Sequence, residues 1–221
     1  MKRCIVVIGA VLLLTLTAVA QDTPRGEVFI GYTYTRFNSA TDVPAFSANG
    51  GGGQFVLNFG KYFGVVSDIG ATHNGNIGGN HLDSTFTNFL FGPRVTIRHW
   101  SRVQPYFQAL WGGVYASTST QVTVTASPSN PIVIPPAVAV NPLSGTTITS
   151  GTVALRASAQ ETAFAMAYGG GLDIKINKFV SFRPIGLDYY MTRLQNLRSA
   201  NDNNQHNLRY TTGFNFAFGA Q

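Results

Sequence analysis

Residues 209–218, RYTTGFNFAF, lie near the end of the chain and carry a pattern that is unusual for a water-soluble protein. Successive side chains of an extended strand point to opposite faces. One face of this strand carries Tyr210, Thr212, Phe214, Phe216 and Phe218. The opposite face carries small or polar residues. Only three residues follow that could cover this aromatic face. The pattern therefore predicts that lipid covers it.

The first 20 residues have the pattern of a secretory signal peptide. Lys2 and Arg3 form a short basic region, an apolar run covers residues 5–16, and small residues at 18 and 20 supply a cleavage pattern. The apolar run is shorter than the roughly 20 residues of a spanning helix, which argues against a retained membrane anchor. We therefore expect residues 1–20 to be removed.

Residues 21–221 are expected to form a single domain with little charge. Because Cys4 leaves with the signal peptide, neither disulfides nor thiolate chemistry are expected. Loss of Lys2 and Arg3 lowers the basic count from 15 to 13 against nine acidic residues, so the net charge is +4. The basic residues are dispersed, which argues against nucleic-acid binding. Only 11% of the residues are charged, whereas a soluble surface carries about 25–35%.

Alternation of apolar and polar residues dominates the chain after the signal, and no sustained helical periodicity is found. Each alternating segment is long enough for one strand. The pattern predicts eight strands, over residues 27–37, 52–59, 65–72, 88–99, 103–115, 165–176, 180–194 and 209–218.

The connections between these strands alternate in length. Three are brief turns, GKYFG, HWSR and INKF, and the longer polar ones cover residues 38–50, 73–83, 117–160 and 195–206. An even strand number with short turns on one side and long loops on the other is typical of bacterial outer-membrane barrels. Closure also removes exposed strand edges. The predicted fold is all-β: a closed eight-stranded antiparallel up-and-down transmembrane β-barrel with short periplasmic turns and long extracellular loops.

The connection over residues 117–160 is exceptionally long. Its segments 121–125 and 146–157 keep alternating, which predicts a protruding extracellular hairpin that extends the two flanking strands. A disordered surface loop is the alternative. Five prolines near its middle predict a proline-rich tip: Pro128, Pro131, Pro135, Pro136 and Pro142. An extracellular ligand is a possible partner of this segment.

The chain resembles the eight-stranded barrels of the outer membrane protein A-like family over residues 27–218. The most specific element is the closing strand, where Thr211, Gly213, Phe216 and Phe218 match the signal that the barrel assembly machinery of the outer membrane recognises. The resemblance implies that machinery as a partner. Two departures are the residues 219–221 after the last phenylalanine and the lack of a following periplasmic domain, so a peptidoglycan-anchoring role is not implied.

The face opposite the apolar one is expected to line the lumen, and it carries charge. An eight-stranded barrel is just wide enough for side chains to fill it, and an unpaired charge in a dry interior costs several kcal/mol. A network of ion pairs that closes the lumen is therefore predicted, with a gated ion path as the alternative. Arg94 and Arg98 lie about 13 Å apart along one strand. The candidate network residues are Asp68, Arg94, Arg98, Asp173, Lys175, Asp188 and Arg209.

Arg183 does not fit simple alternation, because it shares a face with the apolar Ile185 and Leu187. Pro184 is a candidate position for a bulge that turns Arg183 inward. The alternative is that Arg183 extends toward the periplasmic interface.

Aromatic residues are predicted to form two girdles at the membrane interfaces. The girdle at the short turns would contain Tyr62, Phe63, Trp100 and Phe179. The girdle at the long loops would contain Tyr34, Phe37, Tyr115, Tyr189 and Tyr210.

Arg36 and Arg193 share the apolar face of their strands at the long-loop ends. Arginine binds phosphate in a bidentate geometry. We therefore expect these two residues to contact the phosphates of lipopolysaccharide and other outer-membrane lipid head groups. Two solvated arginines at the barrel rim are the alternative.

The histidines indicate neither a metal site nor a cofactor, because their spacing matches no ligand motif. No cofactor is therefore expected. A catalytic site of His81, Asp83 and Ser84 would require a geometry that adjacency in sequence does not supply. The glycine runs 50–53 and 169–171 lie within strands and are interpreted as packing positions rather than phosphate loops.

Three functions from different classes remain open. The first is a non-enzymatic outer-membrane barrel with a structural or surface-interaction role. The second is a lipid-modifying enzyme on the same scaffold. The third is a soluble periplasmic carrier of the lipocalin kind, in which the apolar face would point inward.

Overall fold

The computed structural model describes residues 23–38, 44–77, 82–129, 131–133, 147–148, 150–195 and 204–219. The expected signal peptide, residues 1–20, lies outside these described residues. The described chain consists of strands and connections, with the bounds β1 (Gly26–Phe37), β2 (Phe46–Asn58), β3 (Phe63–Asn74), β4 (Leu82–Thr96), β5 (Val103–Ala126), β6 (Ile132–Val133), β7 (Thr147–Ile148), β8 (Gly151–Lys175), β9 (Val180–Thr192) and β10 (Gln205–Phe218).

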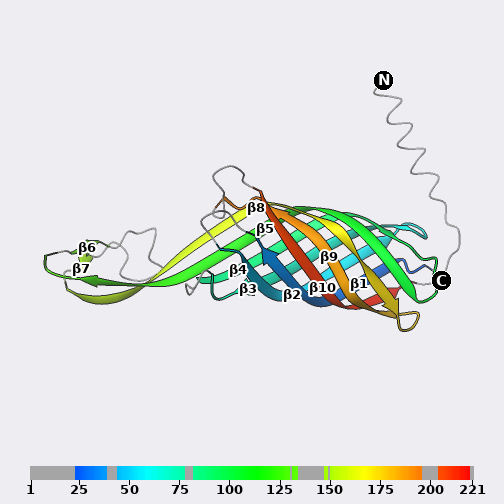
Figure 1. The fold of residues 1–221 in the computed structure, drawn as a ribbon, viewed down its shortest axis with the longest axis horizontal. Coiled ribbons are helices and arrows are strands. Elements are labelled where there is room, and N and C mark those ends of the chain that lie inside the picture. The colour runs from blue at the N-terminus through cyan, green and yellow to red at the C-terminus, as the bar shows by residue number, and fades with distance from the viewer. Residues whose placement is uncertain are drawn as a thin grey trace, which may run out of the picture.

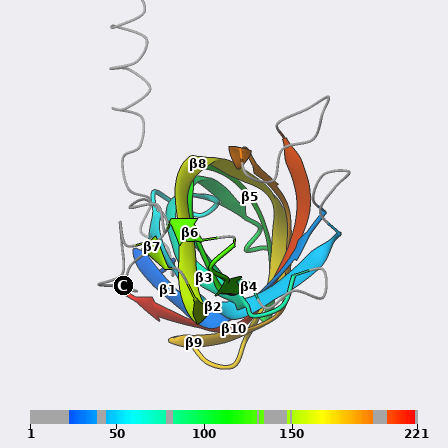
Figure 2. The same ribbon diagram turned by 90° about the vertical axis from the view of Figure 1, so that its left-hand side faces the viewer.

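Eight of these strands form one closed barrel. Their order is β1-β10-β9-β8-β5-β4-β3-β2, and Figure 2 shows the barrel nearly end-on. The first and last strands close it by antiparallel pairing from Gly26↔Phe218 to Arg36↔Leu208. The predicted closed, antiparallel, up-and-down arrangement of eight strands is confirmed. Among the described residues, no helix combines the length and hydropathy needed to cross a membrane.

Several strands extend further at the long-loop end than the sequence predicted. β2 begins at Phe46 and β4 at Leu82, six residues before the expected starts at 52 and 88. The added residues are mostly glycine or polar and break the apolar alternation, but their backbones still pair with neighbouring strands. In contrast, β4 ends at Thr96 instead of residue 99.

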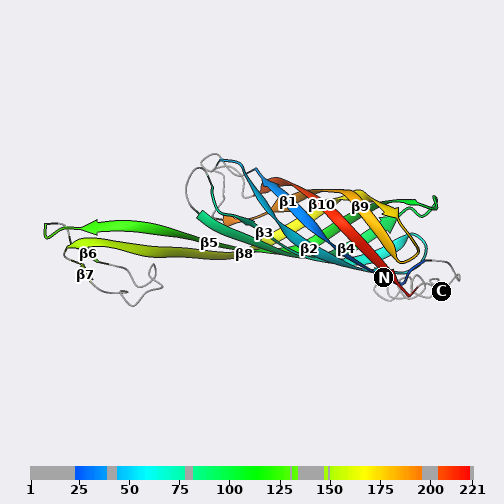
Figure 3. The ribbon, with the colours of Figure 1, turned by 90° about the horizontal axis from the view of Figure 1, so that it is seen from below.

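β5 and β8 continue as a two-stranded hairpin beyond the barrel. Their pairing runs without interruption from Val103↔Ile174 to Ala126↔Gly151, and the hairpin projects from the long-loop end in Figures 1 and 3. β6 and β7 form a separate short pair near its end. Pro135, Pro136 and Pro142 lie outside the described residues.

The barrel has an apolar outside and a partly charged inside. Among the most exposed large apolar side chains are Phe63 (63%), Ile69 (63%) and Phe107 (62%), all on the outer face. Arg183 is 0% exposed in the interior. In water, exposed apolar side chains and a buried charge would both raise the free energy of the folded state. A lipid environment outside and paired charges inside satisfy both.

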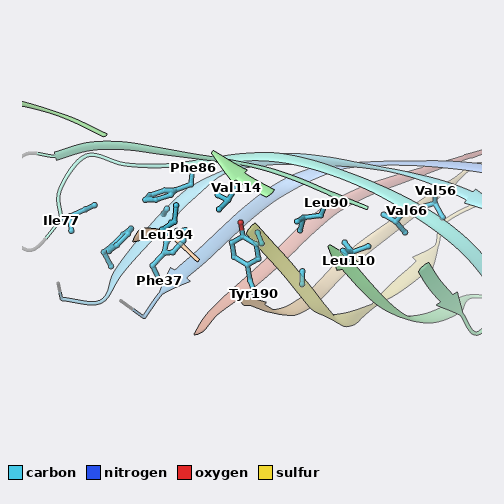
Figure 4. Close-up of a cluster of buried hydrophobic side chains, with 14 residues drawn as sticks. Phe37, Val56, Val66, Ile77, Phe86, Leu90, Leu110, Val114, Tyr190 and Leu194 are labelled. Atoms are coloured by element: carbon cyan, nitrogen blue, oxygen red, sulfur yellow. The ribbon is translucent and has the colours of Figure 1, made fainter. Parts of the chain in front are cut away.

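An aromatic cluster of Phe37, Phe46 and Phe86 fills the lumen at the long-loop end. The Phe37 ring centroid lies 5.0 Å from that of Phe46 and 4.5 Å from that of Phe86. Leu194 and Ile77 join the same buried cluster (Figure 4). The prediction that Phe37 belongs to an interface girdle is therefore wrong. Phe37 follows the inward parity of Thr33 and Thr35, and so it points into the barrel.

The other girdle residues lie on the outer face. Tyr62, Phe63, Trp100 and Phe179 are exposed at the short turns. At the long-loop end Tyr189 is exposed, and the half-buried members are Tyr34, Tyr115 and Tyr210.

Shortening the hairpin should leave the barrel intact. β5 pairs with β4 only as far as Leu82↔Thr120, so the further hairpin residues add no rung to the β4–β5 ladder. We expect that an Asn-Gly turn joining Thr120 directly to Ala157, which are opposite each other, changes the free energy of unfolding by less than about 1 kcal/mol. Urea titration in lipid vesicles measures this. A variant that no longer folds would contradict it.

Candidate functional site

The candidate site is the polar part of the lumen, where side chains from all eight barrel strands meet. We call it the lumen network. It consists of Glu27, Gln54, Asp68, Asn88, Arg94, Arg98, Gln108, Asp173, Arg183, Asp188 and Arg209, which are joined by hydrogen bonds and ion pairs.

Arg209 on β10 joins two carboxylates from different strands. Its Nη1 lies 3.0 Å from Oδ1 of Asp68 on β3, and its Nη2 lies 2.8 Å from Oδ2 of Asp188 on β9. Asn88 on β4 donates a further hydrogen bond of 2.5 Å to Asp68. One guanidinium therefore links β3, β9 and β10 across the lumen.

Arg183 on β9 forms a two-point ion pair with Asp173 on β8. Its Nε lies 2.7 Å from Oδ1 and its Nη2 lies 3.1 Å from Oδ2. The guanidinium carbon also lies 4.1 Å from the ring centroid of Phe29 and 4.3 Å from that of Tyr106. Cation–π contacts of this kind strengthen when the cation is desolvated.

A bulge turns Arg183 inward, as the sequence suggested for the position of Pro184. The register shifts on both sides of β9, between Leu172 and Ile174 on β8 and between Thr211 and Gly213 on β10. Two side chains on the outer face bind the carbonyls beside the shift. Thr212 Oγ1 donates to Arg183 O at 2.9 Å, and Tyr210 Oη donates to Pro184 O at 2.7 Å. These bonds satisfy backbone groups that lipid could not.

Arg94 on β4 contacts carboxylates only through two glutamines. Its Nη2 donates to Oε1 of Gln54 and, at 2.6 Å, to Oε1 of Gln108. Gln54 in turn donates to Asp68 at 2.7 Å, and Gln108 donates to Asp188 at 3.0 Å. Asp68 and Asp188, the two carboxylates that Arg209 joins, are thus both connected to Arg94.

The described interior is neutral overall. Four buried arginine side chains face four carboxylates, namely Arg94, Arg98, Arg183 and Arg209 with Glu27, Asp68, Asp173 and Asp188. A buried charge is tolerated only when pairing and hydrogen bonds compensate its desolvation.

At the short-turn end, Arg98 pairs with Glu27. Nη2 of Arg98 lies 2.6 Å from Oε1 of Glu27, and Nη1 donates to the carbonyl of Lys61 at 2.7 Å. Arg98 was predicted to belong to the network, whereas Glu27 was not. The inward parity that Glu27 shares with Phe29 on β1 is the signal that could have identified it.

Lys175 is not brought into the lumen network. It is the last residue of β8, it is half-buried, and no ion pair among the described residues includes it. A lysine at a strand end can extend its ammonium toward water, which removes the need for a buried partner. The other six predicted network residues lie inside the lumen and are linked as described above.

The glycines near the lumen network leave room for Tyr106. A Cβ added at Gly171 or Gly186 would lie 2.7 or 2.8 Å from the Tyr106 hydroxyl, which is closer than real Cβ contacts. The run 169–171 is therefore a packing feature, as interpreted from the sequence.

Arg36 and Arg193 lie on the outer side at the long-loop end. Nη1 of Arg36 donates to Ser47 Oγ at 3.1 Å, and Nε of Arg193 donates to Asn204 Oδ1 at 2.8 Å. Arg193 is exposed and Arg36 is half-buried. Each has a neutral hydrogen-bond partner, and no ion pair between described residues includes either arginine.

The closing strand presents its aromatic residues outward. Phe216 and Phe218 are exposed, whereas Thr211 is buried in the lumen. Gly213 packs against β1, because an added Cβ would lie 2.5 Å from the Cα of Gly31.

Asp83 and Ser84 do not form a common site. They are adjacent on β4, so their side chains point to opposite faces. Asp83 is exposed, whereas Ser84 is buried and forms a 3.1 Å hydrogen bond with Thr118. His81 lies outside the described residues. Among the residues that the structure describes, no group of three or more His, Cys, Asp or Glu side chains could hold a metal ion.

No family model matches the sequence, and no curated protein matches it either. Solved structures do. Ail, the attachment invasion locus protein of Yersinia pestis, is 15% identical with a TM-score of 0.51, over 89% of this chain and 99% of that chain. Neisserial surface protein A is 10% identical with a TM-score of 0.55, over 87% and 97% of the two chains.

A structure of Ail in complex with the heparin analogue sucrose octasulfate also matches, with a TM-score of 0.50, at 15% identity and over 89% of this chain and 99% of that chain. Identities this low establish the fold alone. The chain has the fold of the eight-stranded β-barrels of the bacterial outer membrane.

Replacing Arg183 should destabilise the barrel strongly. Arg183→Met leaves the carboxylate of Asp173 buried without its cation, which costs about 3–5 kcal/mol. The second change Asp173→Asn should restore part of this loss, because it removes the uncompensated charge. Urea titration in lipid vesicles, followed by the fluorescence of Trp100 and Trp111, measures the free energy of unfolding.

Lys178→Met provides the matched control, since Lys178 is exposed in a short turn. It should change the free energy of unfolding by no more than about 0.5 kcal/mol. If Arg183→Met destabilises the barrel no more than this control does, the Arg183–Asp173 pair has no structural importance.

Proposed function

We propose that this protein is a non-enzymatic integral barrel of the outer membrane with a structural or surface-interaction role. In this proposal residues 1–20 direct export, and residues 21–221 form a single membrane domain. One observation carries the proposal: large apolar side chains cover the outside, while four arginine side chains are buried inside. A soluble lipocalin-like carrier would need the reverse distribution, because its interior would have to accept an apolar ligand.

The lumen is proposed to be closed to ions by two barriers in series. The lumen network occupies its middle, and an ion that passes would have to separate buried pairs at a cost of several kcal/mol. The aromatic cluster of Phe37, Phe46 and Phe86 fills the extracellular end, where it offers an ion no polar ligand. The neutrality of the network favours this closed state over a gated ion path.

The absence of enzymatic activity is proposed from the placement of the candidate catalytic side chains. Because Asp83 and Ser84 point to opposite faces, a carboxylate and a nucleophile are not brought together there. Each carboxylate of the lumen network accepts hydrogen bonds from arginine or amide side chains, and the aromatic cluster separates the network from the extracellular end.

The hairpin over residues 117–160 is proposed as the surface that meets an extracellular ligand. Its described part, formed by the adjoining ends of β5 and β8, projects beyond the barrel (Figure 3) and contains many hydroxyl side chains, of which Thr125 and Thr152 share a 3.2 Å hydrogen bond across the two strands. Such a ribbon presents side chains away from the membrane surface. Barrel assembly is proposed to depend on the closing strand, where Phe216 and Phe218 are exposed for recognition by the assembly machinery.

Arg36 and Arg193 are proposed to bind lipid head groups, in particular the phosphates of lipopolysaccharide. Both lie at the extracellular end of the outer face, where these phosphates are found. Their neutral partners Ser47 and Asn204 orient the guanidinium groups without neutralising them. Phosphate can then accept charge-assisted hydrogen bonds from them.

The purified protein should not conduct ions. Planar lipid bilayers that contain it are expected to show no steady current above that of protein-free bilayers, because no ion can pass the paired network and the aromatic cluster. Co-flotation with vesicles verifies that the protein is inserted. Stable single-channel steps from the unmodified protein would contradict the closed lumen.

Replacing both rim arginines should weaken lipopolysaccharide binding. We expect Arg36→Ser with Arg193→Ser to reduce the lipopolysaccharide that co-purifies with the protein at least about tenfold, since one lost charge-assisted bond contributes roughly 1.5–3 kcal/mol and about 1.4 kcal/mol corresponds to a factor of ten. The control Lys61→Ser with Lys178→Ser removes two charges at the periplasmic turns and should have no effect. Equal retention in both double variants would contradict this proposal.

A further inference from the structure

The short-turn end of the barrel carries basic side chains outside the lumen. All three lysines that follow residue 20 lie there, together with two arginines. We call this set the cationic ring, and its members are Arg25, Lys61, Arg102, Lys175 and Lys178. Lys175 is half-buried and the other four are exposed, and no ion pair between described residues includes any of them. Cations in this state attract an anionic partner.

The described acidic side chains do not neutralise the cationic ring. Glu27 and Asp173 lie near the same end, but they are buried in the lumen, where arginines pair with them. The described carboxylates outside the lumen, those of Asp83 and Glu161, lie at the long-loop end of β4 and β8. Asp22 lies outside the described residues. The short-turn end of the described barrel therefore has a positively charged surface.

The cationic ring surrounds the barrel and does not form a single patch. Lys61 lies in the turn between β2 and β3, and Lys178 lies in the turn between β8 and β9. β5 and β4 separate these two turns on one side of the barrel, and β10 and β1 separate them on the other. Arg102 and Lys175 are neighbours, because Lys175 N donates to the carbonyl of Arg102 at 2.7 Å, and Arg25 immediately precedes β1. A partner that meets every member must therefore surround the barrel.

Exposed aromatic rings lie next to the lysines of the two turns. Nζ of Lys61 lies 5.6 Å from the ring centroid of Tyr62, and Nζ of Lys178 lies 5.2 Å from that of Phe179. In membrane proteins, tyrosine and tryptophan rings are enriched at the level of the lipid head groups. Lysine side chains beside such rings can extend their ammonium groups to the same level, where lipid phosphates lie.

We propose that the cationic ring binds the phosphates of anionic glycerophospholipids and enriches these lipids around the periplasmic end of the barrel. The assignment of this end to the periplasm rests on the proposed function. A lipid layer that surrounds the barrel meets all five cations at once, whereas a protein partner of ordinary interface size covers one patch of the surface. Lysine suits such a partner, because its compact charge on a flexible stem can follow a mobile head group.

The two tryptophans of the chain provide a test with an internal reference. Trp100 is exposed at the turn between β4 and β5, whereas Trp111 is exposed about 26 Å along β5 from its first residue. Each would be observed alone, in Trp111→Phe or in Trp100→Phe protein, by its fluorescence in vesicles of phosphatidylcholine and phosphatidylglycerol at one fixed ratio. A nitroxide quencher would be placed high on an acyl chain, close to the head group, of either the anionic or the zwitterionic lipid.

Trp100 should be quenched at least about threefold more by the labelled phosphatidylglycerol than by the same amount of labelled phosphatidylcholine, because each basic residue near an anionic surface strengthens its attraction severalfold. Trp111 should show no such preference. Co-flotation with the vesicles verifies that each protein is inserted.

Charge removal should abolish the preference of Trp100. The test variant combines Lys61→Gln, Arg102→Gln and Lys175→Gln, which change members of the ring on elements next to the turn between β4 and β5. The control variant combines Arg36→Ser and Arg193→Ser, which remove two charges at the opposite end of the barrel, and it should keep the preference.

Three outcomes would overturn the proposal. They are equal quenching of Trp100 by the two labelled lipids, an equal preference at Trp111, and a preference at Trp100 that the test variant retains. Failure of the proposed membrane barrel is distinguishable, because neither labelled lipid would then quench either tryptophan. Failure of the cationic ring leaves the quenching by lipid in place and removes only the preference for the anionic one.

Discussion

The rest of the structure depends on one constraint: inside a closed barrel surrounded by lipid, each charge must find its partner within the lumen. Outside, no water is present to solvate a stray arginine, and inside there is room only for side chains. Arg183 meets this constraint through Asp173 and two aromatic rings, and Arg209 meets it by sharing Asp68 and Asp188. The fold therefore depends on the ion pairs of the lumen as well as on the backbone hydrogen bonds between the strands.

Apolar burial has a smaller and more local part here than in a soluble domain. The aromatic cluster of Phe37, Phe46 and Phe86 closes the long-loop end, while most large apolar side chains face outward. The interior therefore changes along its axis, from the acidic group Glu27 through the neutral network to an apolar cap. This gradient gives the barrel a polar end at the short turns and an apolar end at the long loops.

Alternation and loop length were sufficient to predict the eight strands and their closure. The strands follow from the two-residue period of alternating side chains, and the closed barrel follows from their even number and the alternating loop lengths. Parity also placed Arg94 and Asp188 inside, and it would have placed Phe37 there had it been applied to the end of β1. Pairing partners could not be predicted. Asp173 meets Arg183 only because a bulge shifts the register of β9, and Gln54 links Arg94 to Asp68 only because three strands have a particular stagger. Lys175 has the parity of an inward-facing residue, but it is the last residue of its strand. Water can solvate its ammonium group there, so it needs no carboxylate partner.

The most direct test of the inside-out barrel is to separate the membranes of expressing cells and to run the protein on a denaturing gel with and without boiling. A closed membrane barrel predicts recovery in the outer-membrane fraction and a change in mobility on boiling, since paired strands resist detergent until heated. Recovery in the soluble periplasmic fraction, with equal mobility in both lanes, would contradict it. The outward phenylalanines would then need a protein partner to cover them instead of lipid.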